Sequence, residues 1–342
     1  MFNLPKPYAI IDGGLATELE DTYKKNLSSR LWSARELHDD PQSIKAIHRA
    51  YLDAGAGTCL KPRLAHSSYQ GSVAGFVAEG FTESEAVKLL RLSTTLALEA
   101  RRDFLAESAC SAITQFTPLV AISLGSFGAS RCDGSEGTGE YDDATDATIS
   151  EFHRIRMQTL DDPSSRLKMG GVDLLIFETI PTLREARVIS SLLSQEPTLF
   201  AGIPAWISFR GKENGLTGHG ESIEECVDAV IANPRVAGVG VNCTKPQYVS
   251  ELLEKATKAI DGAGFGGDKD LFCYPNSGET WDDGARGWVR IAEEHRDFSL
   301  ANWAKDWAKL GATAIGGCCR TNPHHIRQLA DQRNKEQKLL NK

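Results

Sequence analysis

The sequence lacks long apolar runs and an excess of basic residues. No stretch of about 18 apolar residues occurs, so we expect no membrane-spanning helix. The formal net charge is −8, which argues against a nucleic-acid partner because such a partner usually requires a basic face. The start of the chain also lacks the apolar segment of a secretory signal. We therefore expect a cytoplasmic protein that binds neither nucleic acid nor a membrane.

The usual short motifs for metal and dinucleotide sites are missing as well. The chain contains no Cys-x-x-Cys or His-x-x-x-His pair, and no Gly-x-Gly-x-x-Gly follows the first apolar segment. The eight cysteines are scattered over 342 residues, which predicts free thiols or metal thiolates in place of disulfides. We expect Cys132 to be a surface thiol. Four others are expected to be inert core residues: Cys59, Cys110, Cys226 and Cys273.

What the sequence does contain is a series of short apolar segments, nearly all separated by segments with helical spacing. Buried strands that alternate with helices predict a parallel sheet, and eight such units favour a closed barrel over an open sheet. We therefore predict an α/β fold, a single (β/α)8 TIM barrel with an irregular second strand and inserted loops. Its domain would span residues 1–335, followed by a polar C-terminal tail at 336–342. The expected strands lie near 8–11, 57–60, 119–125, 173–178, 205–209, 238–243, 271–275 and 313–318.

Chemically useful side chains follow several of these strands. Asp12 ends the first, Glu178 the fourth, Cys243 the sixth, and Cys318 and Cys319 the eighth. The carboxyl ends of barrel strands meet at one mouth, where active sites of this fold lie. Three thiolates with one open position are typical of a catalytic zinc site. The plainer alternative is a set of buried, inert cysteines, with Asp12 capping the next helix.

The chain contains four motifs in this order: Ile11-Asp12-Gly13-Gly14, Phe177-Glu178-Thr179-Ile180-Pro181, Gly240-Val241-Asn242-Cys243 and Gly316-Gly317-Cys318-Cys319-Arg320. With these motifs the chain resembles the homocysteine S-methyltransferase family. Further matches lie in residues 125–129, 133–136 and 274–278. The chain resembles most the plant and fungal members that use S-methylmethionine or S-adenosylmethionine as methyl donor.

The resemblance implies a metal site and a reaction of methionine biosynthesis. Cys243, Cys318 and Cys319 match the family's Zn2+ ligands, and the sulfur of homocysteine would be the fourth ligand. Zinc lowers the pKa of a bound thiol, so the substrate would react as a thiolate. That thiolate would attack the methyl carbon of the sulfonium donor, and a neutral thioether would leave. The implied partners are therefore two small molecules, homocysteine and a sulfonium donor.

The resemblance also implies the residues that hold homocysteine. Asp12 and Glu178 match positions that bind its amino group, and the backbone of Gly13 and Gly14 can receive its carboxylate. Asn242 matches a position that orients the site. Ser68 belongs to the retained Ser68-Tyr69-Gln70 segment and completes the set.

One segment departs from the family pattern. His66 stands where the family usually has a threonine near homocysteine, and about five extra residues, including Pro62, precede it. This change in residues 57–67 motivates a second hypothesis, a zinc- or thiol-binding barrel that has lost turnover. A third is a metal-free barrel whose cysteines are only core residues. The polar loop at 125–141 is long enough to be functional, either in donor binding or as a solvated excursion.

Overall fold

The computed structural model describes residues 7–56, 63–64, 71–109, 117–162, 171–282, 287–289 and 299–340. Its strands are β1 (Ala9–Ile10), β2 (Arg63–Leu64), β3 (Leu119–Gly125), β4 (Leu174–Ile180), β5 (Ala205–Lys212), β6 (Leu216–Thr217), β7 (Val236–Asn242), β8 (Asp270–Tyr274), β9 (Thr280–Asp282), β10 (Gly287–Val289) and β11 (Ala314–Ile315). Its α-helices are α1 (Leu15–Asp21), α2 (Glu36–Asp39), α3 (Pro41–Ala54), α4 (Val73–Ala78), α5 (Glu83–Ala109), α6 (Ser135–Thr138), α7 (Asp146–Leu160), α9 (Leu183–Gln195), α10 (Ile223–Asp228), α11 (Pro246–Gly262), α12 (Leu300–Lys309) and α13 (Pro323–Leu340). Short 3-10 turns are η1 (Trp32–Arg35), η2 (Gly128–Ser130) and η3 (Glu213–Gly215).

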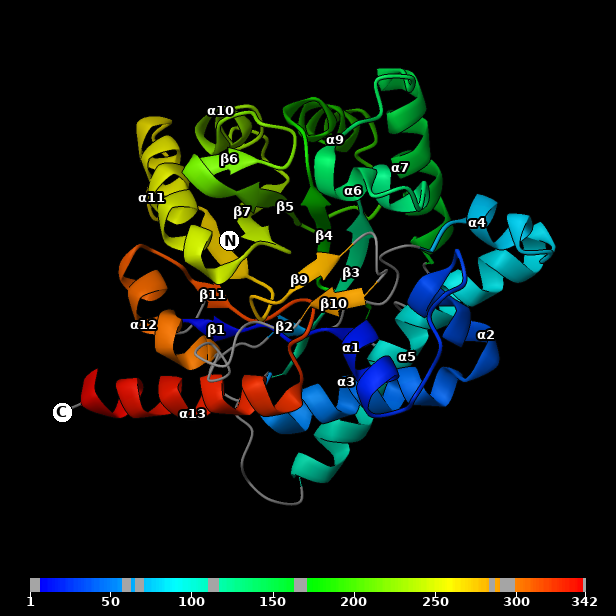
Figure 1. Cartoon of the computed structure of the whole chain (residues 1–342), viewed down its shortest axis with the longest axis horizontal. Coiled ribbons are helices and arrows are strands. Elements are labelled where there is room, and N and C mark those ends of the chain that lie inside the picture. The colour runs from blue at the N-terminus through cyan, green and yellow to red at the C-terminus, as the bar shows by residue number, and fades with distance from the viewer. Residues whose placement is uncertain are drawn as a thin grey trace.

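The main sheet has the strand order of a barrel. Its order is β1-β11-β8-β7-β5-β4-β3-β2, with β6 attached to β5, so that successive strands are neighbours. The first strand pairs in parallel with the last, Ala9 beside Ala314, which an open doubly wound sheet does not require. Helices surround the strands on the outside (Figure 1). The predicted TIM-barrel-like α/β fold is confirmed.

Of the second strand, which we expected near residues 57–60 with an irregular course, the structure describes Arg63–Leu64 as β2. β2 pairs in parallel with β3 through Arg63 and Leu64. The expected strand at 57–60 lies outside the described residues, and so do Ser68 and most of the altered segment 57–67. Among the residues that the structure describes, no ladder joins β1 to β2. The irregularity of the barrel is therefore concentrated beside its second strand.

The helices form where the sequence places caps and an apolar stripe. Helix α3 illustrates this: the Asp40 side chain accepts a hydrogen bond from the Ser43 N–H, Pro41 occupies the first turn, and Gly55 ends the helix with a left-handed φ of 108°. Its buried stripe follows helical spacing and packs against the barrel. The residues of that stripe include Ile44, Ile47, His48, Tyr51 and Leu52.

Inside the barrel, aromatic rings fill the space left by glycines. The rings of Trp206 on β5 and Phe272 on β8 stack with centroids 4.0 Å apart. Between these strands lies β7, where a Cβ on Gly240 would come within 2.1 Å of the Phe272 carbonyl oxygen. Above this apolar layer, inward side chains become polar, namely Ser123, Glu178, Ser208 and Asn242, all buried. The barrel interior is thus hydrophobic at the level of Trp206 and Phe272, and the polar side chains above this level can bind polar groups.

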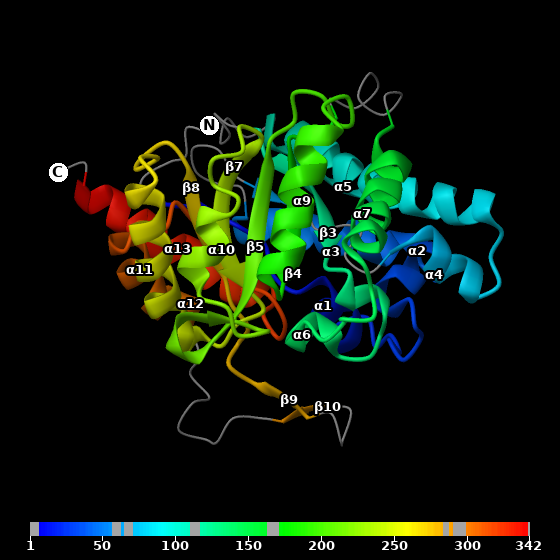
Figure 2. The same ribbon diagram turned by 90° about the horizontal axis from the view of Figure 1, so that it is seen from above.

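Two insertions lie at the ends of strands. The loop after β3 carries η2 and α6 and leads to α7. Strands β9 and β10 form a separate antiparallel hairpin after β8, which projects from one end of the barrel (Figure 2). The inserted loops predicted from the sequence are therefore present.

Helix α13 closes the described chain. The Arg333 side chain on α13 is buried and donates a hydrogen bond to the Tyr8 carbonyl, 3.2 Å away, which fastens the helix to the start of β1. The helix continues to Leu340 and so includes the first residues of the expected tail at 336–342. The division into a domain at 1–335 and a tail stays a prediction. Within the described residues, no helix has the length and apolar composition that crossing a membrane requires.

The packing at Gly240 gives a stability prediction. We expect Gly240→Ala to lower the free energy of unfolding by about 1–3 kcal/mol, because the added methyl group would overlap backbone that cannot rotate away. Urea unfolding followed by circular dichroism measures the change. The control is Gly262→Ala in α11, where a Cβ meets nothing within 4 Å. This variant should be as stable as the wild type or more stable. Equal stability of Gly240→Ala and the wild type would contradict the packing argument.

Candidate metal centre

Three cysteine side chains meet at the carboxyl ends of β7 and β11. The Sγ atom of Cys243 lies 2.8 Å from that of Cys318 and 3.8 Å from that of Cys319. The Cys318 and Cys319 sulfurs are 4.0 Å apart. All three side chains are half-buried, and they form a cluster that can hold a metal ion. The structure therefore brings together the three thiols that the sequence singled out.

The separations can be compared with those around zinc. Two thiolates that each lie about 2.3 Å from a tetrahedral zinc ion are about 3.8 Å apart. The two separations from Cys319 match this value. The Cys243–Cys318 separation is shorter, so these two sulfurs would have to part by about 1 Å to hold the ion. Three sulfurs on one side leave an open fourth position, and the donor set fits a soft metal.

Backbone contacts fix the paired cysteines. The Cys318 N–H donates to the Pro275 carbonyl at 2.8 Å, and the Cys319 N–H donates to Asn276 Oδ1 at 3.1 Å. Thr321 donates from its hydroxyl to the Cys318 carbonyl at 2.6 Å. Pro275 and Asn276 follow β8, the strand between β7 and β11. In the sequence, residues 274–278 stand out only as a family match, and nothing local indicates that they position the cysteines.

Backbone strain gathers at this site. Three non-glycine residues here have a left-handed φ: Thr179 at 60°, Cys243 at 48° and Arg320 at 61°. Each such residue costs of order 1–3 kcal/mol unless its surroundings hold it in place. Thr179 follows Glu178, and Arg320 follows Cys319. The strained positions thus include a cysteine of the cluster and the direct neighbours of two other predicted site residues.

The sulfurs perturb one another electrostatically. Hydrogen bonds from Cys318 and then Cys319 hold the pKa of Cys243 well below its usual range, against the opposite effect of burial. The same contacts raise the pKa of Cys318, because the Cys243 thiolate accepts its proton in a hydrogen bond. Without a metal, the cluster therefore favours one thiolate beside two thiols.

Glu178 is held in a buried polar network. Ser123 donates a hydrogen bond to Glu178 Oε1, and Asn242 Nδ2 lies 3.5 Å from Glu178 Oε2. The Asn242 amide also donates to the Thr179 hydroxyl at 2.8 Å. Its oxygen accepts from the Thr179 N–H at 2.9 Å and the Ser208 hydroxyl at 2.8 Å. Asn242 thus links β4, β5 and β7, a geometry suited to orienting Glu178 and the strained Thr179.

The first strand end packs against the last. The Gly317 N–H donates to the Asp12 carbonyl at 2.9 Å, and the Gly14 N–H donates to the Thr321 carbonyl at 3.0 Å. A Cβ on Gly14 would come within 2.7 Å of the Cys318 carbonyl oxygen, so glycine is required by this close approach. Asp12 is buried, 3% exposed. Asp12, Gly13 and Gly14 therefore lie against the cysteine segment, and their substrate-binding roles stay predictions.

Two further charged residues near the cluster were not singled out from the sequence. Arg210 lies at the end of β5, beside Asn242 in the strand register. Glu136 belongs to α6 in the loop after β3, and burial raises the pKa of its carboxyl. The Arg210 side chain lies beside the loop that carries Glu136, with its Nε atom 3.6 Å from where a Cβ on the neighbouring Gly137 would stand. Their signal in the sequence is weak because the two residues are far apart along the chain.

The remaining described cysteines are as predicted. Cys226 and Cys273 are buried in the core, and Cys132 is exposed. Burial raises the pKa of the Cys273 thiol well above its usual value, which keeps it unreactive. Cys59 and Cys110 lie outside the described residues.

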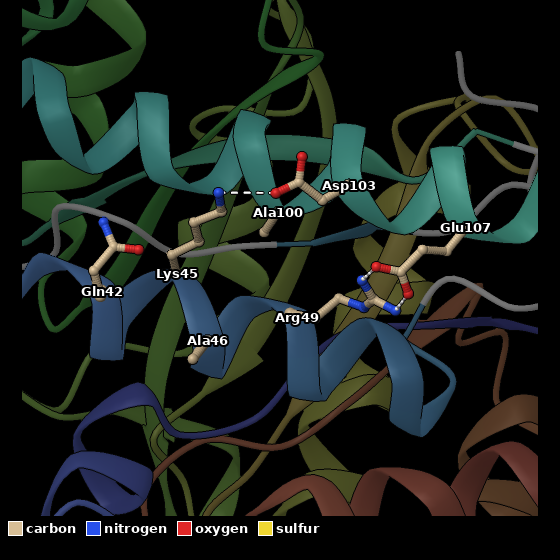
Figure 3. Close-up of a pocket in the computed structure, with 7 residues that line it drawn as sticks. All are labelled: Gln42, Lys45, Ala46, Arg49, Ala100, Asp103 and Glu107. Atoms are coloured by element: carbon tan, nitrogen blue, oxygen red, sulfur yellow. Dashed lines mark hydrogen bonds and ion pairs between the residues drawn. The ribbon is translucent and has the colours of Figure 1, made fainter.

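A surface groove of about 250 Å³ between α3 and α5 has no link to this chemistry (Figure 3). Its charged side chains pair with each other. Lys45 Nζ lies 2.8 Å from Asp103 Oδ2, and Arg49 Nη1 lies 2.9 Å from Glu107 Oε1. The charges that line this groove are therefore already neutralised, and the cysteine cluster remains the candidate site.

Comparison with known proteins agrees with the site. A family model described as homocysteine S-methyltransferase matches residues 9–333. Homocysteine S-methyltransferase 4 of Zea mays is 39% identical over 324 residues, 94% of this chain and 88% of that protein. Selenocysteine Se-methyltransferase of Brassica oleracea var. italica is 38% identical over 328 residues, 94% of this chain and 88% of that protein. The metallated form of the homocysteine methyltransferase MmuM from Escherichia coli matches with a TM-score of 0.75 and 31% identity, over 96% of each chain. The chain therefore belongs to the homocysteine S-methyltransferase family and is a methyltransferase.

Proposed function

We propose that the protein transfers a methyl group from a sulfonium donor, S-methylmethionine or S-adenosylmethionine, to homocysteine in a zinc-dependent reaction. The observation that carries this proposal is the convergence of Cys243, Cys318 and Cys319 within 4.0 Å of one another. The related Escherichia coli methyltransferase has a structure described as metallated, which supports metal binding by this chain. Zinc bound by three thiolates would supply a substrate thiolate at neutral pH.

The chain's own residues would orient the two substrates. Glu178, fixed by Ser123 and Asn242, would hold the ammonium group of homocysteine together with Asp12. The homocysteine sulfur would then face the open side of the cluster. Its lone pair attacks the methyl carbon of the donor, the bond from methyl to sulfonium sulfur breaks, and a neutral thioether leaves. With S-methylmethionine both products are methionine.

We also infer a reducing compartment such as the cytoplasm. Thiols this close together oxidise readily where disulfides are favoured, and they persist as metal ligands where thiols are kept reduced. The partners proposed are small molecules alone.

The metal ligands give the most direct prediction. Cys243→Ala and Cys318→Ala should each lose zinc and methyl transfer, because two remaining sulfurs do not complete the site. The fold should persist, because these residues lie at strand ends and are only half-buried. Zinc is quantified on protein purified without chelator, alongside circular dichroism. The control Cys132→Ser removes an exposed thiol and should keep both zinc and activity. Full zinc occupancy in Cys243→Ala would refute the ligand assignment.

The carboxylate at the mouth gives a second prediction. Glu178→Gln should raise the KM for homocysteine about tenfold or more, because a charge-assisted hydrogen bond contributes roughly 1.5–3 kcal/mol. Zinc content should not change, since Glu178 is not a proposed ligand. Initial rates at varied homocysteine and saturating donor measure the effect. An unchanged KM for homocysteine would place its ammonium group elsewhere.

A donor panel separates the enzyme from the alternatives. Methionine formation is measured with S-methylmethionine and with S-adenosylmethionine, and zinc is quantified on the same sample. Turnover with either donor is the expected result. Bound zinc without turnover would favour the binding barrel instead, and clearly substoichiometric zinc would count against both zinc hypotheses. Selenocysteine is added as a second acceptor because one relative is a selenocysteine Se-methyltransferase.

A further inference from the structure

Two opposite charges near the cysteine cluster have no ionic partner. Within the described part of the chain, the Arg210 guanidinium makes no hydrogen bond or ion pair with another side chain. Glu136 Oε2 is buried and likewise lacks a hydrogen-bond partner there. An unpaired buried carboxylate oxygen costs of order 1–3 kcal/mol, so such an atom calls for an explanation. The mechanism proposed above uses neither residue.

The two charges are close but do not bind each other. Gly137 follows Glu136 in the loop. A Cβ atom built on Gly137 would lie 3.6 Å from Arg210 Nε and 3.7 Å from Arg210 Cζ. Arg210 also favours the charged form of Glu136 and so lowers its pKa against the effect of burial. Glu136 Oε2 has no hydrogen-bond partner among the described residues, so Arg210 does not bind that oxygen. An anion and a cation that lie near each other without pairing suit a ligand that carries both charges.

The backbone around these two charges is firmly held. The Gly218 N–H donates to the Arg210 carbonyl at 2.8 Å, and a Cβ on Gly218 would come within 2.3 Å of the Gly137 carbonyl oxygen. The other end of the loop is anchored on a buried carboxylate. Glu185 accepts hydrogen bonds from the Phe127 N–H at 2.7 Å and the Tyr141 hydroxyl at 2.5 Å. The two charges are therefore placed by rigid contacts and do not sit on a loose surface.

We propose that Glu136 and Arg210 form the subsite for the amino-acid end of the methyl donor. Glu136 accepts hydrogen bonds from the donor's ammonium group, and Arg210 binds its carboxylate through the guanidinium fork. The donor class is then an α-amino acid that carries a sulfonium group, and not a simple methylated ammonium or sulfonium compound. This inference rests on the proposed function, since it names the second substrate of the same site.

The position of the subsite fits a second substrate. Arg210 is the register neighbour of Asn242, and Cys243 is the next residue along that strand. Glu178, the residue proposed for homocysteine, lies on β4, a different strand from Arg210, and contacts the Asn242 side chain. Separate carboxylates can thus hold the ammonium groups of two amino-acid substrates, while both sulfur atoms face the cysteines.

The test compares the kinetic constants of both substrates in matched variants. Glu136→Gln and Arg210→Met should each raise the KM for S-methylmethionine about tenfold or more, with little change in the KM for homocysteine. Zinc content and the thermal unfolding midpoint should equal those of the wild type. The control is Glu140→Gln, an exposed carboxylate four residues further along the same loop, which should leave every constant unchanged.

A donor analogue identifies the group that Glu136 binds. The S-methylmethionine analogue without its amino group is measured as a donor, or as a competitor of S-methylmethionine. The wild type should bind it more weakly than S-methylmethionine, and Glu136→Gln should abolish that difference. If Glu136→Gln weakens both compounds equally, or raises the KM for homocysteine instead, the subsite is refuted while the proposed function stands. Zinc-loaded wild-type protein that transfers no methyl group from any donor would overturn both.

Discussion

The candidate metal site depends on bringing three sulfur atoms to one point from two strands that are not neighbours. β8 lies between β7 and β11, so the cysteines meet only if all three strands end at one level. The register provides this, with Asn242 beside Tyr274 and Cys273 beside Ile315. Segments after β8 then hold the paired cysteines through the Cys318 and Cys319 amides. A slip of one residue in either ladder would turn the inward side chains outward and disperse the cluster.

Other features of the barrel follow from this convergence. Thr179, Cys243 and Arg320 adopt left-handed backbone, which persists because the buried amide of Asn242 and the carbonyl contacts of the cysteine segment hold it. Gly14 is required where the first and last strand ends touch. The apolar interior below, built on the stacked Trp206 and Phe272 rings, gives the strands a rigid base. The residues with strained backbone therefore lie at the mouth of the barrel, and the aromatic packing that stabilises the strands lies deeper in its interior.

Apart from the strand expected at 57–60, which lies outside the described residues, the sequence predicted the barrel strands and the cysteine cluster because both depend on local patterns. Apolar runs and the residues at their ends can be recognised in the sequence without knowing their partners. The barrel topology then determines that these strand ends meet at one mouth. The polar network was harder to predict. Asn276 and Ser208 are short polar residues whose partners lie far away in the chain, and Glu136 and Arg210 come together only through the loop after β3. Such pairings depend on the folded positions of distant segments, which periodicity cannot give. The buried Glu185 that anchors this loop pairs with residues more than 40 positions away, so it could not be predicted in this way either.

The charged side chains at the barrel mouth would affect donor binding and product release in the proposed reaction. A sulfonium and a thiolate enter, and two neutral thioethers result, so the transfer removes one positive and one negative charge. Asp12, Glu178 and Glu136 place carboxylates around the cluster, against the guanidinium of Arg210, while that of Arg320 is already paired with Glu279 and Asp21. Such a field attracts a cationic donor more strongly than its neutral product. Because the attraction is lost when the methyl group moves, the same carboxylates that aid donor binding would not hold back the thioether. Product release then requires breaking only the contacts to its amino-acid end.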